Sequence, residues 1–254
     1  MTWIFLSPHF DDVVLSCGGM IAEMVSHGQT VELWTICAGN PPPGPLSPLA
    51  RSLHKRWGLK RNAAAIRRKE DRQSCAVLGV TARHFHIPDC IYRKDPITGE
   101  FLILENEDLF QSLPEVEIPL AADLELHLAR TLPINARVVS PLTMGGHIDH
   151  HLVRRAAEAL CRPLWYYADY PYAALSSNDQ AKWILPDWET FELPVLRTSL
   201  LKWQEAIAEH ESQISTFWGS LVEMQQSIEA YWQAGGGSKL WGNETKVIHN
   251  KTVN

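Results

Sequence analysis

The sequence predicts an α/β protein, with a mostly parallel sheet, helices on both faces and a C-terminal helical segment. The first observation is a set of short, mostly apolar runs at residues 3–7, 31–37, 83–87 and 137–141. Such runs are typical of strands that are covered on both faces. The second observation is that helical patterns separate these runs, as in proteins with parallel sheets. A chain of 254 residues can bury a large core, so one domain with an appendage is the natural expectation.

The helices between the strands are predicted from glycine positions and from apolar spacing. Residues 14–28 and 62–79 each close on a glycine that suits a helix C-terminus. Residues 121–132 and 149–161 place apolar residues at helical spacing. Residues 39–50 are rich in proline, which does not fit the interior of a regular element. We therefore expect a long loop there, after the second strand.

The C-terminal part has a different pattern. After about residue 195 the chain is helical over a long stretch, with a break expected near Gly219, and residues 235–254 have the composition of a loose tail. We therefore expect one domain over residues 1–195, followed by a helical extension and loose tail over residues 196–254.

Composition limits the partners of the chain. It has 29 acidic and 23 basic residues and a net charge of −6, which gives little electrostatic support for binding nucleic acid or an anionic membrane. The first residues contain no basic region and no apolar run long enough for a secretion signal or a membrane span. Five widely spaced cysteines are expected to be buried free thiols. These features predict a cytoplasmic protein without an integral membrane segment.

Several residues lead to expectations about packing. Gly18 and Gly19 are expected to let the first helix pack closely on the sheet. The charged run at residues 67–72 predicts a solvated helix face, apart from Arg68. The C-terminal extension is compatible with a homo-oligomer formed through its helices, because three of its tryptophans suit an exposed helix or a subunit contact: Trp203, Trp218 and Trp232.

Histidines and aspartates gather at two predicted strand ends. The segment "SPHFDD", residues 7–12, follows the first strand, and "SPLTMGGHIDHH", residues 140–151, follows the strand at 137–141. Ligands of doubly wound folds bind beyond the carboxyl ends of the strands, so both clusters are expected to face one cleft. Burying acids and imidazoles there is costly unless a positive partner meets them. A metal ion is such a partner.

The residue types in the two clusters suit a catalytic zinc site, which uses three protein ligands and leaves one position for water. His9 and Asp12 plus one histidine of the second cluster supply such a set. The spacing does not choose among His147, His150 and His151. Iron or another divalent ion can also occupy sites with nitrogen and oxygen ligands.

The remaining polar residues of the clusters have candidate roles. Asp11 lies beside the ligands and suits a general base. His147 could carry positive charge at an oxyanion or give a proton to a leaving amine. Asp149 could orient one of the imidazoles.

Simpler explanations exist for each cluster taken alone. An isolated H-x-x-D is common by chance, and "HIDHH" also suits the N-terminal region of a helix. A dinucleotide-binding turn would need G-x-G-x-x-G directly after the first strand, where this chain has "SPHFDD".

The two clusters together resemble the motifs of the GlcNAc-phosphatidylinositol de-N-acetylase-like family, also called the LmbE or PIG-L deacetylases. Pro8-His9-Phe10-Asp11-Asp12-Val13 is similar to its first motif, P-H-P-D-D-E, and His147-Ile148-Asp149-His150 to its second, H-x-D-H. The resemblance covers roughly residues 3–170. It also includes three shorter matches: Arg68-Lys69-Glu70 through Leu78-Gly79, Pro88-Asp89 and, more faintly, Ser212-Gln213.

The resemblance implies a Rossmann-like fold that holds one zinc ion through His9, Asp12 and His150. It implies that Asp11 is the general base and that His147 stabilises the tetrahedral oxyanion. Members of this family hydrolyse the N-acetyl group of an N-acetylglucosamine unit or of a related N-acyl amine.

Two further positions and two departures bear on the substrate. Arg68 and Asp89 match positions that line the sugar site in relatives. Phe10 replaces the second proline of the first motif, and Val13 replaces its glutamate. Neither change removes a catalytic group, so their effect is expected in substrate preference.

These observations lead to one hypothesis and two alternatives. The leading hypothesis is a zinc-dependent hydrolase that removes an N-acyl group, above all N-acetyl, from an N-acetylglucosamine-type amino sugar or its conjugate by attack of metal-bound water. The first alternative is a non-catalytic sugar- or nucleotide-binding α/β module whose histidines and aspartates are structural. The second is an esterase that uses the same metal centre.

Overall fold

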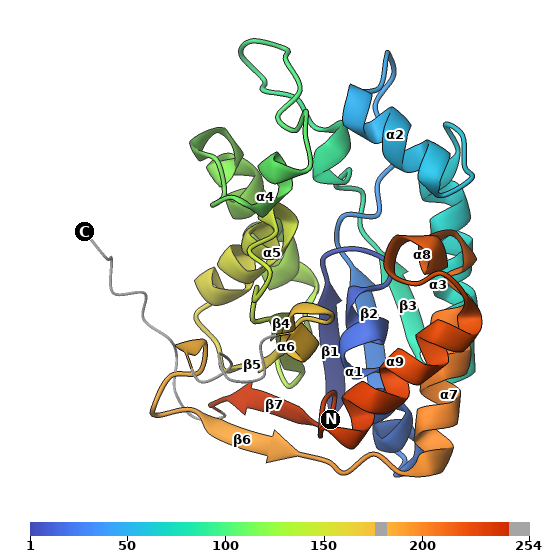
Figure 1. Ribbon diagram of the computed structural model, residues 1–254. Helices are drawn as coiled ribbons and strands as arrows, with labels where there is room; N and C mark the ends of the chain where they lie inside the picture. Colours follow the sequence, from blue (N-terminus) through green and yellow to red (C-terminus); the bar gives the residue numbers. More distant parts are fainter. Residues whose placement is uncertain (176–181, 244–254) are drawn as a thin grey trace.

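A seven-stranded mixed sheet forms the centre of the molecule, with the strand order β3-β2-β1-β4-β5-β7-β6 (Figure 1). The structure is a computed structural model and describes residues 1–175 and 182–243. Strands β3, β2, β1, β4 and β5 are parallel, whereas β7 runs antiparallel to both β5 and β6. The strands span Thr2–Ser7 (β1), Thr30–Thr35 (β2), Thr81–His84 (β3), Arg137–Pro141 (β4), Leu164–Tyr167 (β5), Glu189–Glu192 (β6) and Lys239–Gly242 (β7).

Helices cover both faces of the sheet, because right-handed crossovers that run outward from β1 in two directions place their helices on opposite faces. α1, α3 and α7 pack together, and α4 packs on α5 at the other side of the sheet (Figure 1). The helices span Asp12–Ser26 (α1), Pro48–Arg56 (α2), Ala63–Leu78 (α3), Ile118–Thr131 (α4), Ile148–Ala159 (α5), Tyr172–Leu175 (α6), Arg197–Ala208 (α7), Glu211–Phe217 (α8) and Leu221–Gln233 (α9). Three short 3-10 helices span Cys90–Tyr92 (η1), Glu107–Phe110 (η2) and Glu115–Glu117 (η3).

The predicted fold class, a mostly parallel sheet in an α/β protein, is confirmed. β1 is the middle strand of the five parallel strands and is buried from Trp3 onward, as its apolar run predicted. The strand predicted over 83–87 is wrong at both ends, since β3 covers residues 81–84. β3 lies at the edge of the sheet and is only partly buried, so its sequence lacks the apolar run that marks the central strands.

The proline-rich region contains a helix that the sequence did not predict. α2 begins at Pro48, inside the segment expected to be a loop. The Ser47 side chain accepts a hydrogen bond from the backbone N–H of Ala50, and Pro48 occupies the first turn, where its missing N–H is no loss. Pro48 therefore begins a helix inside the proline-rich segment.

The C-terminal extension departs from its prediction in two places. The break near Gly219 is confirmed, because α8 ends at Phe217 and α9 begins at Leu221, but a further break separates α7 from α8 at His210. The predicted loose tail contains β7, which pairs with β5 and β6. The rest of that tail, residues 244–254, lies outside the described residues. The domain division at residue 195 and a homo-oligomer through the C-terminal helices stay predictions.

Trp203 joins the extension to the first helix. It is completely buried, and its Nε1 donates a hydrogen bond of 2.6 Å to the carbonyl oxygen of Val14. A Cβ atom added at Gly18 would lie 2.5 Å from Cδ1 of Trp203, and one added at Gly19 would lie 2.6 Å from its Cε3. The glycines therefore admit a tryptophan of α7, not the sheet, and Trp203 packs α7 on α1 within the chain.

Other expectations from composition are met unevenly. Four cysteines are buried free thiols, whereas Cys161 is exposed. Trp218 is buried as well, and Trp232 is half-buried and donates its indole N–H to the carbonyl of Val195. Among the described residues, no helix is long and apolar enough to cross a bilayer.

Candidate metal centre and active site

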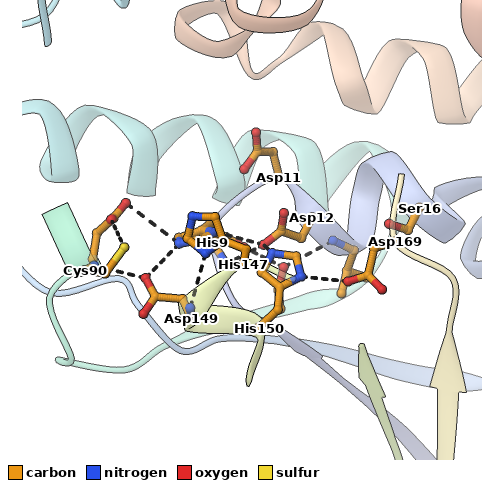
Figure 2. Close-up of polar contacts among 12 residues, drawn as sticks. His9, Asp11, Asp12, Ser16, Cys90, His147, Asp149, His150 and Asp169 are labelled. Carbon is orange, nitrogen blue, oxygen red and sulfur yellow. Dashed lines mark hydrogen bonds and ion pairs between the residues drawn. The ribbon is translucent and has the colours of Figure 1, made fainter. Parts of the chain in front are cut away.

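The two histidine–aspartate clusters meet at the carboxyl edge of the sheet (Figure 2). β1 and β4 are parallel neighbours, so the segments that follow them emerge side by side. His9, Asp11 and Asp12 from the first segment and His147 and His150 from the second line one cavity of about 350 Å³. The structure therefore brings together the groups that the sequence placed at two distant strand ends.

Asp12 lies between two imidazoles. Its Oδ2 is 3.1 Å from Nδ1 of His9 and 3.2 Å from Nε2 of His150. Two ligand atoms that each lie about 2.1 Å from a tetrahedral metal ion are separated by about 3.4 Å. Each of these two pairs of atoms is therefore spaced as two ligands of one divalent metal ion would be. Nitrogen atoms of His9, His147 and His150 also lie within 4.8 Å of one another, so His147 is close to the same position.

A carboxylate holds the far nitrogen of each of these two imidazoles. Nε2 of His9 is 2.9 Å from Oδ2 of Asp149, and Nδ1 of His150 is 2.7 Å from Oδ1 of Asp169 (Figure 2). Metal-bound histidines commonly have such a partner, which fixes the ring and raises its basicity. Asp149 thus contacts an imidazole, and its orienting role, which the sequence suggested, stays a prediction. Asp169 was not given this role, although it also follows the end of a parallel strand, β5.

Asp149 is itself held by buried partners that the sequence did not reveal. Arg93 Nη1 lies 2.6 Å from Asp149 Oδ1, and the backbone N–H of Cys90 donates to Asp149 Oδ2 at 3.0 Å. Arg93 also pairs with Glu117 through two hydrogen bonds of 2.5 and 2.7 Å. Burial opposes the positive charge of Arg93, but Asp149 and Glu117 keep the pKa of Arg93 well above its ordinary value.

Positive charge on its neighbours stabilises the ionised carboxylate of Asp12 at this site. Burial disfavours the imidazolium form, yet Asp12 and its neighbours raise the pKa of His9 well above its ordinary value and that of His150 to about 10. Burial likewise opposes ionisation of Asp12, but His150 and His9 hold its pKa well below the usual range. The site thus favours a cation among these three groups. Protons on the imidazoles or a metal ion can supply that charge.

His147 has a different environment from the other two histidines. It is the N-cap of α5, and its Nδ1 accepts a hydrogen bond of 3.2 Å from the backbone N–H of Asp149. Burial and the neighbouring His9 and His150 hold the pKa of His147 well below its ordinary value. In the neutral ring, Nδ1 is the acceptor, so the proton resides on Nε2.

Arg67 belongs to the site, which contradicts the solvated helix face predicted for this part of the run. It is buried, with its guanidinium carbon 5.1 Å from the ring centroid of Phe10 and 4.8 Å from that of Trp57. Its Nη2 lies 3.3 Å from Asp11 Oδ1, and its Nη1 lies 3.8 Å from Asp89 Oδ2. Arg67 therefore links the candidate base to the candidate sugar-binding aspartate.

Arg68 points elsewhere. Its guanidinium donates to the carbonyl oxygen of Ala38 and to Oδ1 of Asn40, and it lines a separate cavity beside Arg72 and His86. Of the two positions expected to line the sugar site, the structure brings Asp89 to the cavity of the histidines and does not bring Arg68 there.

The two departures from the first motif lie in the packed interior. Phe10 is buried, and its ring meets His84 edge-on at 5.7 Å besides contacting Arg67. Val13 is completely buried, so an apolar side chain fills the position of the motif's glutamate.

The mouth of the cavity has an apolar lining that the sequence did not predict. Three peripheral elements, α2, η2 and α8, supply it. Glu70 of α3 fixes α8, since its carboxylate accepts hydrogen bonds from the N–H of Ser212 at 3.0 Å and from its hydroxyl at 2.6 Å. We call the following residues the outer wall: Leu53, Arg56, Trp57, Leu109, Phe110 and Phe217.

Comparisons with known proteins bear on the family and the fold of the chain. The family model described as PIG-L, GlcNAc-PI de-N-acetylase, matches residues 4–161. A 2'-N-acetylparomamine deacetylase from Niallia circulans is 24% identical over 273 residues, which cover 94% of this chain and 93% of that protein.

Two solved structures extend the similarity to the whole fold. The zinc-inhibited form of teicoplanin deacetylase Orf2 has a TM-score of 0.77 and 28% identity, covering 95% of this chain and 97% of that one. The A40926 pseudoaglycone deacetylase Dbv21 has a TM-score of 0.68 and 28% identity, covering 94% of each chain. The predicted family and the predicted N-deacetylase activity are confirmed. The chain belongs to the PIG-L family of GlcNAc-PI de-N-acetylases.

Proposed function

We propose that this N-deacetylase is zinc-dependent and releases the acetyl group of an N-acetylglucosamine unit in a glycoconjugate. The observation that carries the proposal is the position of Asp12 Oδ2, 3.1 and 3.2 Å from two imidazoles whose far nitrogens each meet a carboxylate. His9, Asp12 and His150 would hold the ion. The similarity to deacetylases of paromamine and teicoplanin supports an amino-sugar substrate.

The base in this proposal is Asp11. When bound, a zinc ion acts as a Lewis acid for the amide carbonyl and lowers the pKa of its water to about 7. Asp11 lines the same cavity and accepts a proton from the attacking water, while Arg67 fixes its carboxylate at 3.3 Å. As the C–N bond breaks, Asp11 returns this proton to the departing amine. The oxygen of the water and its other hydrogen become the hydroxyl group of the acetic acid product.

His147 stabilises the oxyanion as a neutral donor. Its Nδ1 already accepts the N–H of Asp149, so its Nε2–H is free to donate to the amide oxygen as negative charge develops. This assignment replaces the protonated imidazole that the sequence suggested. Asp149 contributes indirectly, by orienting His9 through Nε2.

The sugar is held at the polar side of the cavity. Asp89 lies there, and Arg67 takes the position that the resemblance assigned to Arg68. A planar guanidinium paired with a carboxylate offers both donors and acceptors for sugar hydroxyls.

The test is the Asp11→Asn variant, assayed with N-acetylglucosamine conjugates by the appearance of free amine. The variant is expected to lose about 10²- to 10⁴-fold in kcat, the range typical of a general base, and to bind a stoichiometric metal ion. Retention of more than a tenth of the wild-type kcat would remove Asp11 from the base role. O-acetyl sugars assayed in parallel distinguish an esterase, and elemental analysis of the wild-type protein identifies the metal.

A further inference from the structure

The outer wall has more apolar surface than an amino sugar alone requires. Phe110 is 47% exposed in spite of its size, and it lies at the mouth of the catalytic cavity. Its ring centroid is 5.8 Å from that of His147 and 6.3 Å from that of Tyr172, edge-on in both cases. An exposed aromatic ring this close to the reacting centre is positioned to contact the part of a substrate next to the amino sugar.

The rest of the outer wall continues this surface around the mouth. Leu53 and Trp57 come from α2, Leu109 from η2 and Phe217 from α8. Three elements far apart in the sequence thus present apolar side chains to one space. Aromatic and aliphatic walls of this kind stabilise flat, apolar groups through burial and ring contacts.

The charges at the mouth exclude a positively charged occupant. Asp89 is already engaged, because its Oδ2 lies 3.8 Å from Arg67 and 3.9 Å from His9. The other two carboxylates that line the cavity are Asp11, the proposed base, and Asp12, a proposed metal ligand. Together with the histidines they form what we call the catalytic floor. Arg56 lies at the exposed rim, and among the described residues no acid is within ion-pair distance of it. A polyamine would find no counter-charge here and one repelling cation.

We propose that the amino sugar carries an apolar, ring-containing aglycone without positive charge, and that this aglycone binds the outer wall. The proposal rests on the proposed deacetylase function and adds the substrate class. The aglycone is preferred to a long acyl chain as the occupant because the apolar groups of three separate elements line one cavity of about 350 Å³, whereas a chain needs a narrow channel.

The experiment compares two substrates that differ only in the aglycone, phenyl and methyl N-acetyl-β-glucosaminide. Wild-type kcat/KM is expected to be at least about tenfold higher for the phenyl glycoside, the effect of burying one aromatic ring. Phe110→Ala is expected to reduce this ratio to below about threefold, whatever it does to both rates. Leu104→Ala serves as the matched control, since Leu104 is an exposed apolar residue close in sequence that does not line the cavity.

Other outcomes overturn the proposal. A ratio near one in the wild type excludes aglycone recognition by the outer wall. If lengthening the acyl group of the methyl glycoside raises kcat/KM and Phe110→Ala abolishes that gain, the wall holds the acyl chain instead. Higher kcat/KM for an N-acetylated aminoglycoside than for the phenyl glycoside excludes the charge argument.

Failure of the deacetylase function itself gives a separate result, with no turnover of either glycoside. In that case calorimetry of phenyl and methyl β-glucosaminide, the free amines, still measures the aglycone effect. Tenfold tighter binding of the phenyl compound that Phe110→Ala removes would support the outer wall even then. Equal binding of the two compounds would contradict it.

Discussion

The catalytic floor and the outer wall of the same cavity are built in opposite ways. The floor consists of buried polar groups at strand ends, each held by another polar group, as His9 is by Asp149 and His150 by Asp169. The outer wall consists mainly of apolar groups from peripheral elements, with Arg56 as its charged member, and its most prominent member, Phe110, is 47% exposed. The difference indicates that the sheet fixes the chemistry, while elements that can change independently determine which substrate reaches it.

The largest effect is expected from removing a ligand of the floor. His150→Ala should abolish stoichiometric metal binding and lower kcat by several orders of magnitude, because His150 is one of the three proposed ligands and its Nε2 lies 3.2 Å from Asp12 Oδ2. Elemental analysis and the amine assay measure the two losses. His151→Ala is the matched control: His151 is the next residue and is only half-buried, so its metal content should stay at the wild-type level. Equal losses in both variants would contradict the ligand assignment.

A smaller effect is expected from the carboxylates behind the imidazoles. Asp169→Asn and Asp149→Asn should each weaken metal affinity by about 10- to 100-fold, because the amide no longer holds the ring as a carboxylate does. Competition with a chelator measures the affinity. Asp149→Asn should also lower the free energy of unfolding, since Arg93 would lose one of its two charged partners and keep only Glu117. If the metal affinity of both variants equals that of the wild type, neither carboxylate supports a ligand.

Removing the hydrogen bonds that fix α8, which carries part of the outer wall, should change KM more than kcat. Glu70→Ala removes both acceptors of Ser212 and frees α8, so KM should rise by up to about tenfold while kcat changes less than twofold. Steady-state kinetics with the phenyl glycoside measures both constants. Lys69→Ala, an exposed position on the same helix, is the control. A fall in kcat with unchanged KM would show that α8 acts on the floor instead.

The smallest effect concerns the pH dependence of the free energy of unfolding, to which His54 of α2 contributes. His54 Nε2 lies 2.6 Å from the hydroxyl of Tyr92. Burial lowers the pKa of His54, and the negative charge of nearby Asp89 opposes this lowering only in part. The folded state therefore disfavours the proton that unfolded His54 takes up below about pH 6.5. Stability should fall as the pH drops through that value, and His54→Gln should make the decline shallower by a fraction of one proton. Urea unfolding at pH 7.5 and 5.5 tests this, and parallel declines in both proteins would contradict it.

The sequence predicted the floor better than any other part of the molecule. Its residues lie in two contiguous motifs directly after β1 and β4, and parallel strands bring their carboxyl ends to one edge. The same reasoning extended to β5 would have found Asp169. It placed Arg68 at the sugar site where the structure has Arg67, because neighbouring helix positions point about 100° apart and only the packing of α3 decides which one faces the site.

Thus the sequence by itself determined the alternation of strands and helices that gives a mostly parallel sheet, the meeting of the two motifs and the types of ligand available. Local patterns suffice for these features, since strand polarity and crossover handedness leave few arrangements. The tertiary structure alone decided that α2, η2 and α8 form the mouth of the cavity, that Trp203 packs on Gly18 and that β7 completes the sheet. These contacts join residues that are far apart in the chain and depend on complementary shape and on burial. The spacing of apolar residues in the sequence does not indicate which two surfaces will pack together.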